Sequence, residues 1–402
     1  MELVNIDAGQ VQRLINCSRG VWRFGDCCTK EPPGELSARP FSYHWGPMKL
    51  TLPLLGLYAV GAGALASEPL AVDGAPHILV VVADDLGWND VSWHGSSQVP
   101  IPNLQGLADE GLVLDNYYVQ PVCSPTRSTI LTGRHVIHTG IYDPDCGPGN
   151  TNSVPLNITM LPEHLSSVGY ESHAVGKWHL GMFSRSAIPT GKGFNSFYGY
   201  YSGAEDYYTH VSNGANDFHR DRGSNLTIPD VVGQYSTFLY ADKAVKVIEN
   251  FADQHLGPDN VDDDTRLFMY LAFQAIHSPT EVPTEYSDRF NETIPDTPDH
   301  VGQQRRIVAG MIACMDEAVG NVTAALKNAG MIDNTLILFT TDNGGPAQGF
   351  NNNMASNWPL RGMKRTLWQG GVRGAGFIRG PGIRAAGEVR SLREPMALWS
   401  HE

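Results

Sequence analysis

The sequence predicts an α/β protein with a large, mostly parallel mixed sheet and helices on both faces. Three short runs of β-branched and other apolar residues predict strands buried on both sides: 77–83 (HILVVVA), 267–273 (LFMYLAF) and 335–340 (TLILFT). Segments with helical spacing separate these runs, and such alternation is typical of a parallel sheet. With 402 residues, 42% of them hydrophobic, the chain can bury a substantial core.

The remaining elements follow in order along the chain. Residues 103–110 have helical character, and residues 170–179 are expected to form a strand. Residues 235–251 predict a helix, because one stripe at helical spacing carries Ala244, Val247, Ile248 and Phe251. Residues 303–329 are expected to form one long helix. In a sheet of this kind, chemistry gathers beyond the carboxyl ends of the strands.

The start of the chain has the features of a secretory leader. Residues 48–66 (MKLTLPLLGLYAVGAGALA) contain a positive start at Lys49, an apolar stretch and a terminal Ala-x-Ala pattern. We expect a signal peptide at 48–66, a main domain at 67–402, and an upstream extension at 1–47 that is not translated or is removed by processing. A membrane anchor is the alternative, but the apolar run is short and rich in glycine for a span. We therefore expect no stable membrane anchor.

Charge and glycosylation motifs agree with this location. The formal net charge of −14 at pH 7 argues against a general nucleic-acid binder. Four Asn-x-Ser/Thr sequons follow the expected cleavage point, at Asn157, Asn225, Asn291 and Asn321. We expect N-glycosylation there and delivery through the secretory pathway, to the lysosome or the extracellular space.

Polar residues follow two of the predicted buried strands directly. Asp84 and Asp85 come after 77–83, while Asp342 and Asn343 come shortly after 335–340. Carboxylate and amide oxygens are hard ligands that suit Ca²⁺ or Mg²⁺. Each pair alone also fits a simpler role, as a helix cap or a turn. Together at one edge of a sheet, they favour a metal site.

A cysteine lies in a polar and basic setting in residues 121–134 (PVCSPTRSTILTGR). A helix beginning just after Pro125 would aim its amide groups and the positive end of its dipole at Cys123. If Cys123 begins the first turn, Arg127 shares its face and can reach its charge or a bound oxyanion. The alternatives are a free thiol, a disulfide with Cys146, or a Cys/His nucleophile as in thiol hydrolases.

Two further segments carry candidate polar groups. Lys177 and His179 lie two residues apart in 169–181 (GYESHAVGKWHLG), so an extended chain would point them to the same side. His277 follows an apolar strand in FQAIHSP, and Lys364 lies in the basic segment PLRGMKRTLWQGG. Each also has a simpler interpretation, as a structural histidine or a solvated lysine.

These segments together resemble the sulfatase family. CSPTRSTILTGR resembles its first signature and GYESHAVGKWHLG its second, while VVADDLGWNDV, FQAIHSP, TTDNGG and NWPLRGMK are similar to further blocks in the same order. The resemblance runs from about residue 77 to 382. It is greatest for the arylsulfatase B, I and J group, whose best-known member removes 4-sulfate from N-acetylgalactosamine. Residues 204–210 (AEDYYTH) and 315–327 (MDEAVGNVTAALK) support this subgroup.

The resemblance implies a fold and a nucleophile. The fold would be the alkaline-phosphatase-like sulfatase fold, with a C-terminal subdomain that is incomplete here because residues after about 382 match poorly. A formylglycine-generating enzyme would oxidise Cys123 to an aldehyde, reading the cysteine, Pro125 and Arg127. Hydrated to a geminal diol, the aldehyde would attack sulfur with one hydroxyl and expel sulfate with the other. Thr126 departs from the serine common at its position.

The resemblance also implies a ligand set and residue roles. Ca²⁺ would be held by residue 123 together with Asp84, Asp85, Asp342 and Asn343. Arg127 would steady the diol oxygen, and Lys177 and Lys364 would hold sulfate oxygens. His179 would take up the diol proton, and His277 would assist the leaving alcohol, so both histidines, with Lys177 and Lys364, would face the substrate. The substrate would be a sulfated carbohydrate or an aryl sulfate ester.

Two other function classes remain open from the residues. A phosphatase or phosphodiesterase of the wider alkaline-phosphatase superfamily would share this sheet but use Ser or Thr and two transition metals with His ligands. A truncated, non-catalytic sulfatase-like binding protein is the second alternative. The oxygen ligands and the setting of Cys123 argue against the first.

Overall fold

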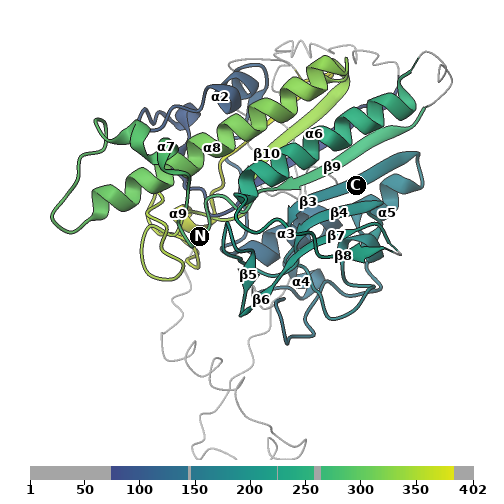
Figure 1. Ribbon diagram of the computed structural model, residues 1–402, viewed down its shortest axis with the longest axis horizontal. Helices are drawn as coiled ribbons and strands as arrows, with labels where there is room; N and C mark the ends of the chain where they lie inside the picture. Colours follow the sequence, from purple (N-terminus) through teal and green to yellow (C-terminus); the bar gives the residue numbers. More distant parts are fainter. Residues whose placement is uncertain (1–73, 144–145, 224, 258–263, 384–402) are drawn as a thin grey trace, which may run out of the picture. The chain divides into compact units, whose positions relative to one another are not determined.

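The computed structural model describes residues 74–143, 146–223, 225–257 and 264–383 (Figure 1). The expected upstream extension and signal peptide lie outside the described residues.

A mixed sheet of nine strands forms the centre of the main domain. Its strand order is β2-β11-β10-β1-β9-β3-β4-β7-β8. The central strands β10, β1, β9, β3 and β4 are parallel, and the strands outside them are antiparallel. The bounds are β1 (His77–Ala83), β2 (Leu112–Val113), β3 (Tyr170–Lys177), β4 (Ser196–Tyr200), β7 (Phe218–Asp221), β8 (Leu226–Thr227), β9 (Arg266–Ala272), β10 (Thr335–Thr341) and β11 (Gly376–Arg379). The predicted mostly parallel mixed sheet is confirmed.

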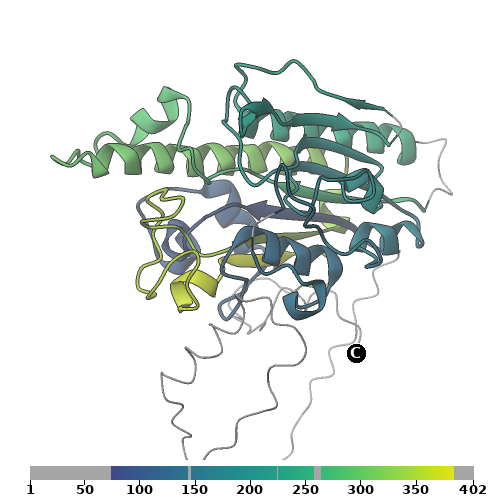
Figure 2. The same cartoon turned by 90° about the horizontal axis from the view of Figure 1, so that it is seen from below.

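Helices cover both faces of this sheet, as predicted (Figures 1 and 2). The long helices α6 (Ser236–His255) and α8 (Val301–Asn328) pack with α2 (Pro102–Asp109) on one face. The other face carries α3 (Cys123–Thr132) and α5 (Leu161–Ser166). Shorter elements are α4 (Val136–Thr139), α7 (Thr284–Ser287), α9 (Gln369–Val372) and the hairpin of β5 (Val211–Ser212) and β6 (Ala215–Asn216).

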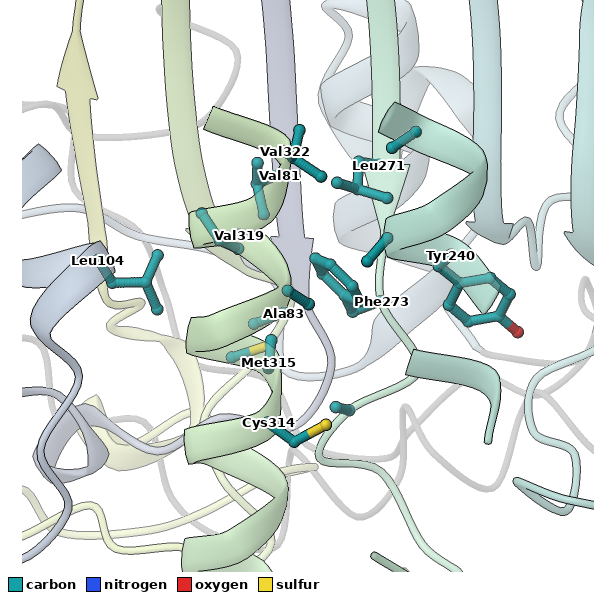
Figure 3. Close-up of a cluster of buried hydrophobic side chains, with 14 of the residues drawn as sticks. Val81, Ala83, Leu104, Tyr240, Leu271, Phe273, Cys314, Met315, Val319 and Val322 are labelled. Atoms are coloured by element: carbon teal, nitrogen blue, oxygen red, sulfur yellow. The ribbon is translucent and has the colours of Figure 1, made fainter. Parts of the chain in front are cut away.

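Strand β1 divides the hydrophobic core between the two faces. Its odd-numbered residues Leu79, Val81 and Ala83 join the cluster that contains α6 and α8, and its even-numbered residues Ile78, Val80 and Val82 join the cluster beneath α3. Figure 3 shows Val81 and Ala83 beside side chains of α8 and β9. Side chains alternate between the faces of a strand, so a strand covered on both faces must be apolar throughout. This explains the uninterrupted run HILVVVA.

Helix α8 is long and apolar enough to cross a membrane by length and composition, with a mean hydropathy of 1.3 over its most apolar window. However, 72% of that window is buried within the domain. An evenly apolar helix is expected where protein surrounds it. Helix α8 is therefore a core helix of the domain.

Two local predictions near the carboxyl end of the sheet were wrong. Helix α3 begins at Cys123 rather than after Pro125, because proline is tolerated in the first turn, where its missing N–H would have no partner. Strand β3 ends at Lys177 rather than His179. The next residue, Trp178, is buried and donates its indole N–H to the carbonyls of Gly181 and Ala187. The chain therefore leaves the sheet, and His179 adopts a left-handed φ of 54°.

Candidate active site

The carboxyl ends of β1 and β10 bring the predicted metal-binding residues together. Ala83 is aligned with Thr341 in the parallel pairing, so the residues that follow each strand lie at the same level. The backbone N–H of Asp85 donates to Asp342 Oδ1 at 3.2 Å, and Asn343 Nδ2 donates to Asp85 Oδ1 at 2.7 Å. With Asp84, these residues have no exposed surface. Strand register alone therefore accounts for this juxtaposition.

Three buried cations neutralise the three buried carboxylates. Arg127 donates through Nε and Nη2 to Asp342 Oδ2, at 3.0 and 2.8 Å. Lys177 Nζ lies 2.5 Å from Asp84 Oδ2, and Lys364 Nζ lies 2.7 Å from Asp85 Oδ1. Burial of unpaired charges would be costly, so this one-to-one pairing is what allows the cluster to be buried.

The pKa values reflect the same pairing. Burial alone would raise the pKa of Asp84, but Lys177, His277 and Arg127 hold it below its usual value. Burial alone would lower the pKa of Lys364, but Asp85 raises it well above its usual value. Each group is thus stabilised in its charged form by its partners rather than by water.

Cys123 lies at the N-terminus of α3, inside this cluster. Its Sγ is 3.6 Å from Asp84 Oδ1, its exposed fraction is 2%, and it forms no disulfide. The suggested disulfide with Cys146 is therefore not present. Burial raises the pKa of the thiol to about 12, although Lys177 and Lys364 act in the opposite direction. The thiol is protonated at neutral pH, which argues against a thiolate nucleophile.

Both predicted histidines reach the site. His277 Nδ1 lies 2.6 Å from the Ser278 carbonyl oxygen, which can only accept, so Nδ1 carries a proton. Its Nε2 faces Asp85 Oδ2 at 3.6 Å. Burial, with Lys364 and Lys177, lowers the pKa of His277 despite the nearby carboxylates. Nε2 of the neutral ring therefore presents a lone pair to the cluster.

His179 is positioned by its backbone rather than by strand geometry. Its N–H donates to the Tyr201 carbonyl at 3.1 Å, and its carbonyl accepts from Ser124 Oγ at 2.8 Å. Gly203 lies against the imidazole ring, where an added Cβ would come within 2.7 Å of ring atoms. The expectation that Lys177 and His179 share one side of an extended strand was wrong in its geometry, although both residues reach the site.

The carboxylate and amide oxygens of the site fit a hard cation, while the Cys123 sulfur and the His277 nitrogen are softer donors. One ligand atom from each of Asp84, Asp85, Cys123 and His277 can be chosen so that all four lie within 4.8 Å of one another. Asn343 Oδ1 is buried without a hydrogen-bond partner among the described residues. Buried oxygens normally have a partner, so a bound cation would satisfy this one. His277 belongs to this group and Asp342 does not. Both carboxylate oxygens of Asp342 already have partners. Arg127 donates to Oδ2, and the backbone N–H of Asp85 donates to Oδ1.

A cavity of about 600 Å³ opens onto the cluster. Four of the predicted residues line it, namely Cys123, His179, His277 and Lys364. The other predicted residues are buried and do not line the cavity, namely Asp84, Asp85, Arg127, Lys177, Asp342 and Asn343. Sequence reasoning missed the other lining residues, which include Glu205, Asp206, Ser212, Asn213, Phe350 and Asn351. Apart from Ser212, which ends the two-residue strand β5, they lie in loops without periodicity. Glu205 and Asp206 had one sequence signal, the AEDYYTH segment, which was interpreted only as a mark of the subgroup.

Comparison with known proteins decides the family. The sequence profile of the sulfatase family matches residues 76–400. The chain belongs to the sulfatase family. Mouse arylsulfatase J is 40% identical over 318 residues, which cover 78% of this chain and 49% of arylsulfatase J. Human N-acetylgalactosamine-6-sulfatase is 29% identical over 341 residues, covering 78% of this chain and 58% of that enzyme.

Solved structures agree with this sulfatase fold. The crystal structure of Ps i-CgsB in complex with k-i-k-neocarrahexaose superposes with a TM-score of 0.69 at 26% identity, covering 81% of this chain and 70% of that one. The chain spans about half the length of arylsulfatase J. The predicted family and fold are confirmed.

Proposed function

We propose that this chain is a sulfuric ester hydrolase that removes sulfate from a sulfated sugar or an aryl sulfate. The observation that carries the proposal is the position of Cys123, buried at a helix N-terminus between three carboxylates and three cations and open to a cavity. Formylglycine derived from Cys123 would supply, as its hydrate, one hydroxyl to attack sulfur and a second to expel sulfate. A buried, protonated thiol has no comparable role of its own.

Ca²⁺ would complete this site. Asp84, Asp85, Asp342 and Asn343 would hold it together with residue 123, and the partnerless Asn343 Oδ1 supports that assignment. The cation would lower the pKa of the diol and offset the charge that builds on the sulfuryl group. It would also change the charge balance: three carboxylates and three cations cancel, so the divalent ion would leave the buried cluster positive. A positive cluster attracts the anionic ester.

The side chains around residue 123 would divide the remaining work. Lys177 and Lys364 would hold sulfate oxygens, and Arg127 would steady the oxygen of residue 123. His179, at the cavity wall, would take up the proton of the diol. His277 would assist the leaving alcohol after its Nε2, which presents a lone pair in the neutral ring, has taken up a proton, and its lowered pKa makes the release of that proton easy.

For the substrate we propose an N-acetylgalactosamine 4-sulfate unit of a glycosaminoglycan. Support comes from the subgroup resemblance, from the similarity to arylsulfatase J, and from the likeness to a structure that holds a neocarrahexaose. The formylglycine-generating enzyme would be the partner during maturation. We propose passage through the secretory pathway to the lysosome or outside the cell, and the four sequon asparagines are all exposed, as glycosylation requires.

Protein produced in secretory cells tests the proposal directly. Mass spectrometry of the peptide that contains Cys123 should show the mass loss of thiol-to-aldehyde conversion, and the protein should hydrolyse an aryl sulfate. Cys123→Ser should keep the melting temperature and lose sulfatase turnover, because a serine ester needs a second attack by water. A serine variant with full activity would instead support the phosphatase-like alternative.

A further inference from the structure

The lining of the cavity contains two chemically different groups of side chains. One group is Lys364, Cys123, His179 and His277, at the buried cluster. The other, called the acidic wall, comes from segment 203–213 and includes Glu205, Asp206, Ser212 and Asn213. A sulfated sugar is divided in the same way, into an anionic ester and a neutral ring that carries hydrogen-bond donors. The acidic wall therefore suits the ring and not the sulfate.

Glu205 has one oxygen that lacks a partner. Its Oε1 accepts from the Tyr240 hydroxyl at 3.0 Å and lies 3.4 Å from His210 Nδ1. Its Oε2 is buried and has no hydrogen-bond partner among the described residues, although the side chain is only 2% exposed. A buried carboxylate oxygen without a donor is costly, and burial raises the pKa of Glu205 to about 7. The cavity beside Glu205 is where a ligand could supply the donor.

The loop that carries Glu205 is fixed relative to the reaction centre. Gln274 donates its side-chain amide to the Glu205 carbonyl, and the Tyr207 hydroxyl donates to the carbonyls of Gln274 and His277, at 3.1 and 3.0 Å. The acidic wall and the histidine next to the cluster therefore belong to one hydrogen-bonded unit. Groups held in this way can select a substrate by geometry without first having to become ordered.

We propose that Glu205 is a specificity-determining residue, whose Oε2 accepts a hydrogen bond from a hydroxyl or amide N–H of the sugar that bears the sulfate. This inference rests on the proposed function and deepens it. A uronate carboxylate at the same place would be repelled by Glu205 and would offer no donor. The substrate class is thus a sulfated neutral sugar, such as an N-acetylhexosamine, rather than a sulfated uronic acid.

Glu205→Gln tests this assignment, since the amide keeps the shape but loses the charge and one acceptor. The readout is the ratio of kcat/KM for N-acetylgalactosamine 4-sulfate to kcat/KM for an aryl sulfate, which has no sugar donor. In assays above pH 7, where Glu205 is ionised, loss of a hydrogen bond to this charged group should lower the ratio by about tenfold to a hundredfold. Glu205→Asp keeps the charge but retracts the oxygens, so it should lower the ratio as well.

Glu281→Gln is the matched control. Glu281 accepts from the Tyr207 N–H at 3.1 Å within the same unit, and it does not line the cavity. Its variant should keep the wild-type ratio. If Glu205→Gln leaves the ratio unchanged, or lowers kcat/KM equally for both substrates, the proposed role of Glu205 is wrong.

A binding measurement separates this inference from the proposed function. Saturation-transfer NMR with desulfated N-acetylgalactosamine requires no turnover, and Ca²⁺-loaded wild type should give a signal that Glu205→Gln loses. Binding that depends on Glu205 in a protein without sulfatase activity would uphold the sugar site and reject the hydrolase. Equal signals from both proteins would reject the role of Glu205 whatever the activity.

Discussion

Replacing Asp342 by asparagine should destabilise the domain strongly, even without any metal. Arg127 donates to Asp342 Oδ2 at 3.0 and 2.8 Å, and neither side chain has exposed surface. In Asp342→Asn the one carboxylate in the described part of the chain that still pairs with the guanidinium is Asp84, at 3.5 Å. Removal of one partner from a buried ion pair typically destabilises by about 3–5 kcal/mol, because the other charge stays buried.

The expected shift in melting temperature follows from domain size. A change of 1 kcal/mol moves the melting temperature of a large domain by about 2 °C, so Asp342→Asn should melt roughly 6–10 °C below wild type. The measurement is thermal unfolding with excess chelator in both samples. Since neither protein then carries a cation, loss of a possible metal ligand cannot contribute to the difference.

Asp143→Asn is the matched control for this experiment. Asp143 lies 3.4 Å from Arg365, and both side chains are largely exposed, at 71% and 45%. Exposed ion pairs contribute about 0–1 kcal/mol, so this variant should melt within about 2 °C of wild type. If the two variants melted at the same temperature, the argument that buried pairing holds Arg127 in place would be refuted.

Three further predictions concern the cation, acid stability and the position of His179. Ca²⁺ at about 100 times its Kd should stabilise the wild type by about 2.7 kcal/mol, and an unchanged melting temperature would contradict the cation site. Burial, with Arg266, lowers the pKa of His77 to about 4, and its Nδ1 accepts from the Leu267 N–H at 3.0 Å. The unfolded chain therefore binds the proton first, so stability should fall as pH drops from 6.5 towards 4, and His77→Asn should flatten that slope in melting curves. Gly203→Ala should lower kcat on an aryl sulfate with little change in melting temperature, because its Cβ would displace the His179 ring; wild-type kcat would contradict the placement of that ring.

The strands that position the metal-binding residues could be predicted because each is buried on both faces. Strands β1, β9 and β10 are uninterrupted apolar runs, and the polar residues after two of them mark the carboxyl edge. Strands β2 and β8 have two residues each, none of them buried, so they leave no pattern in the sequence. These short strands form because they pair with neighbouring strands that only the folded sheet brings beside them.

The residues of the site also divide into those that the sequence predicts and those that it does not. Asp84 and Asp342 could be placed together because strand register is a general property of parallel sheets. Glu205 could not, since its partners Tyr240 and His210 come from a distant helix and from a residue with a left-handed φ of 57°. His179 was predicted for the site but for a reason that the structure does not support, because buried Trp178 ends the strand before it.

The burial of Cys123 limits when an enzyme could oxidise it. In the folded domain Pro125, Thr126 and Arg127 of the same motif are buried as well, so a modifying enzyme cannot bind this segment. The helix is covered only when its side chains pack against the sheet, and Asp342 is made 215 residues after Arg127. At about 5–20 residues per second, ribosomal synthesis of that stretch takes roughly 10–40 s. Oxidation of Cys123 would therefore have to precede folding of the domain. A chain that folds more slowly would then have its cysteine converted more completely.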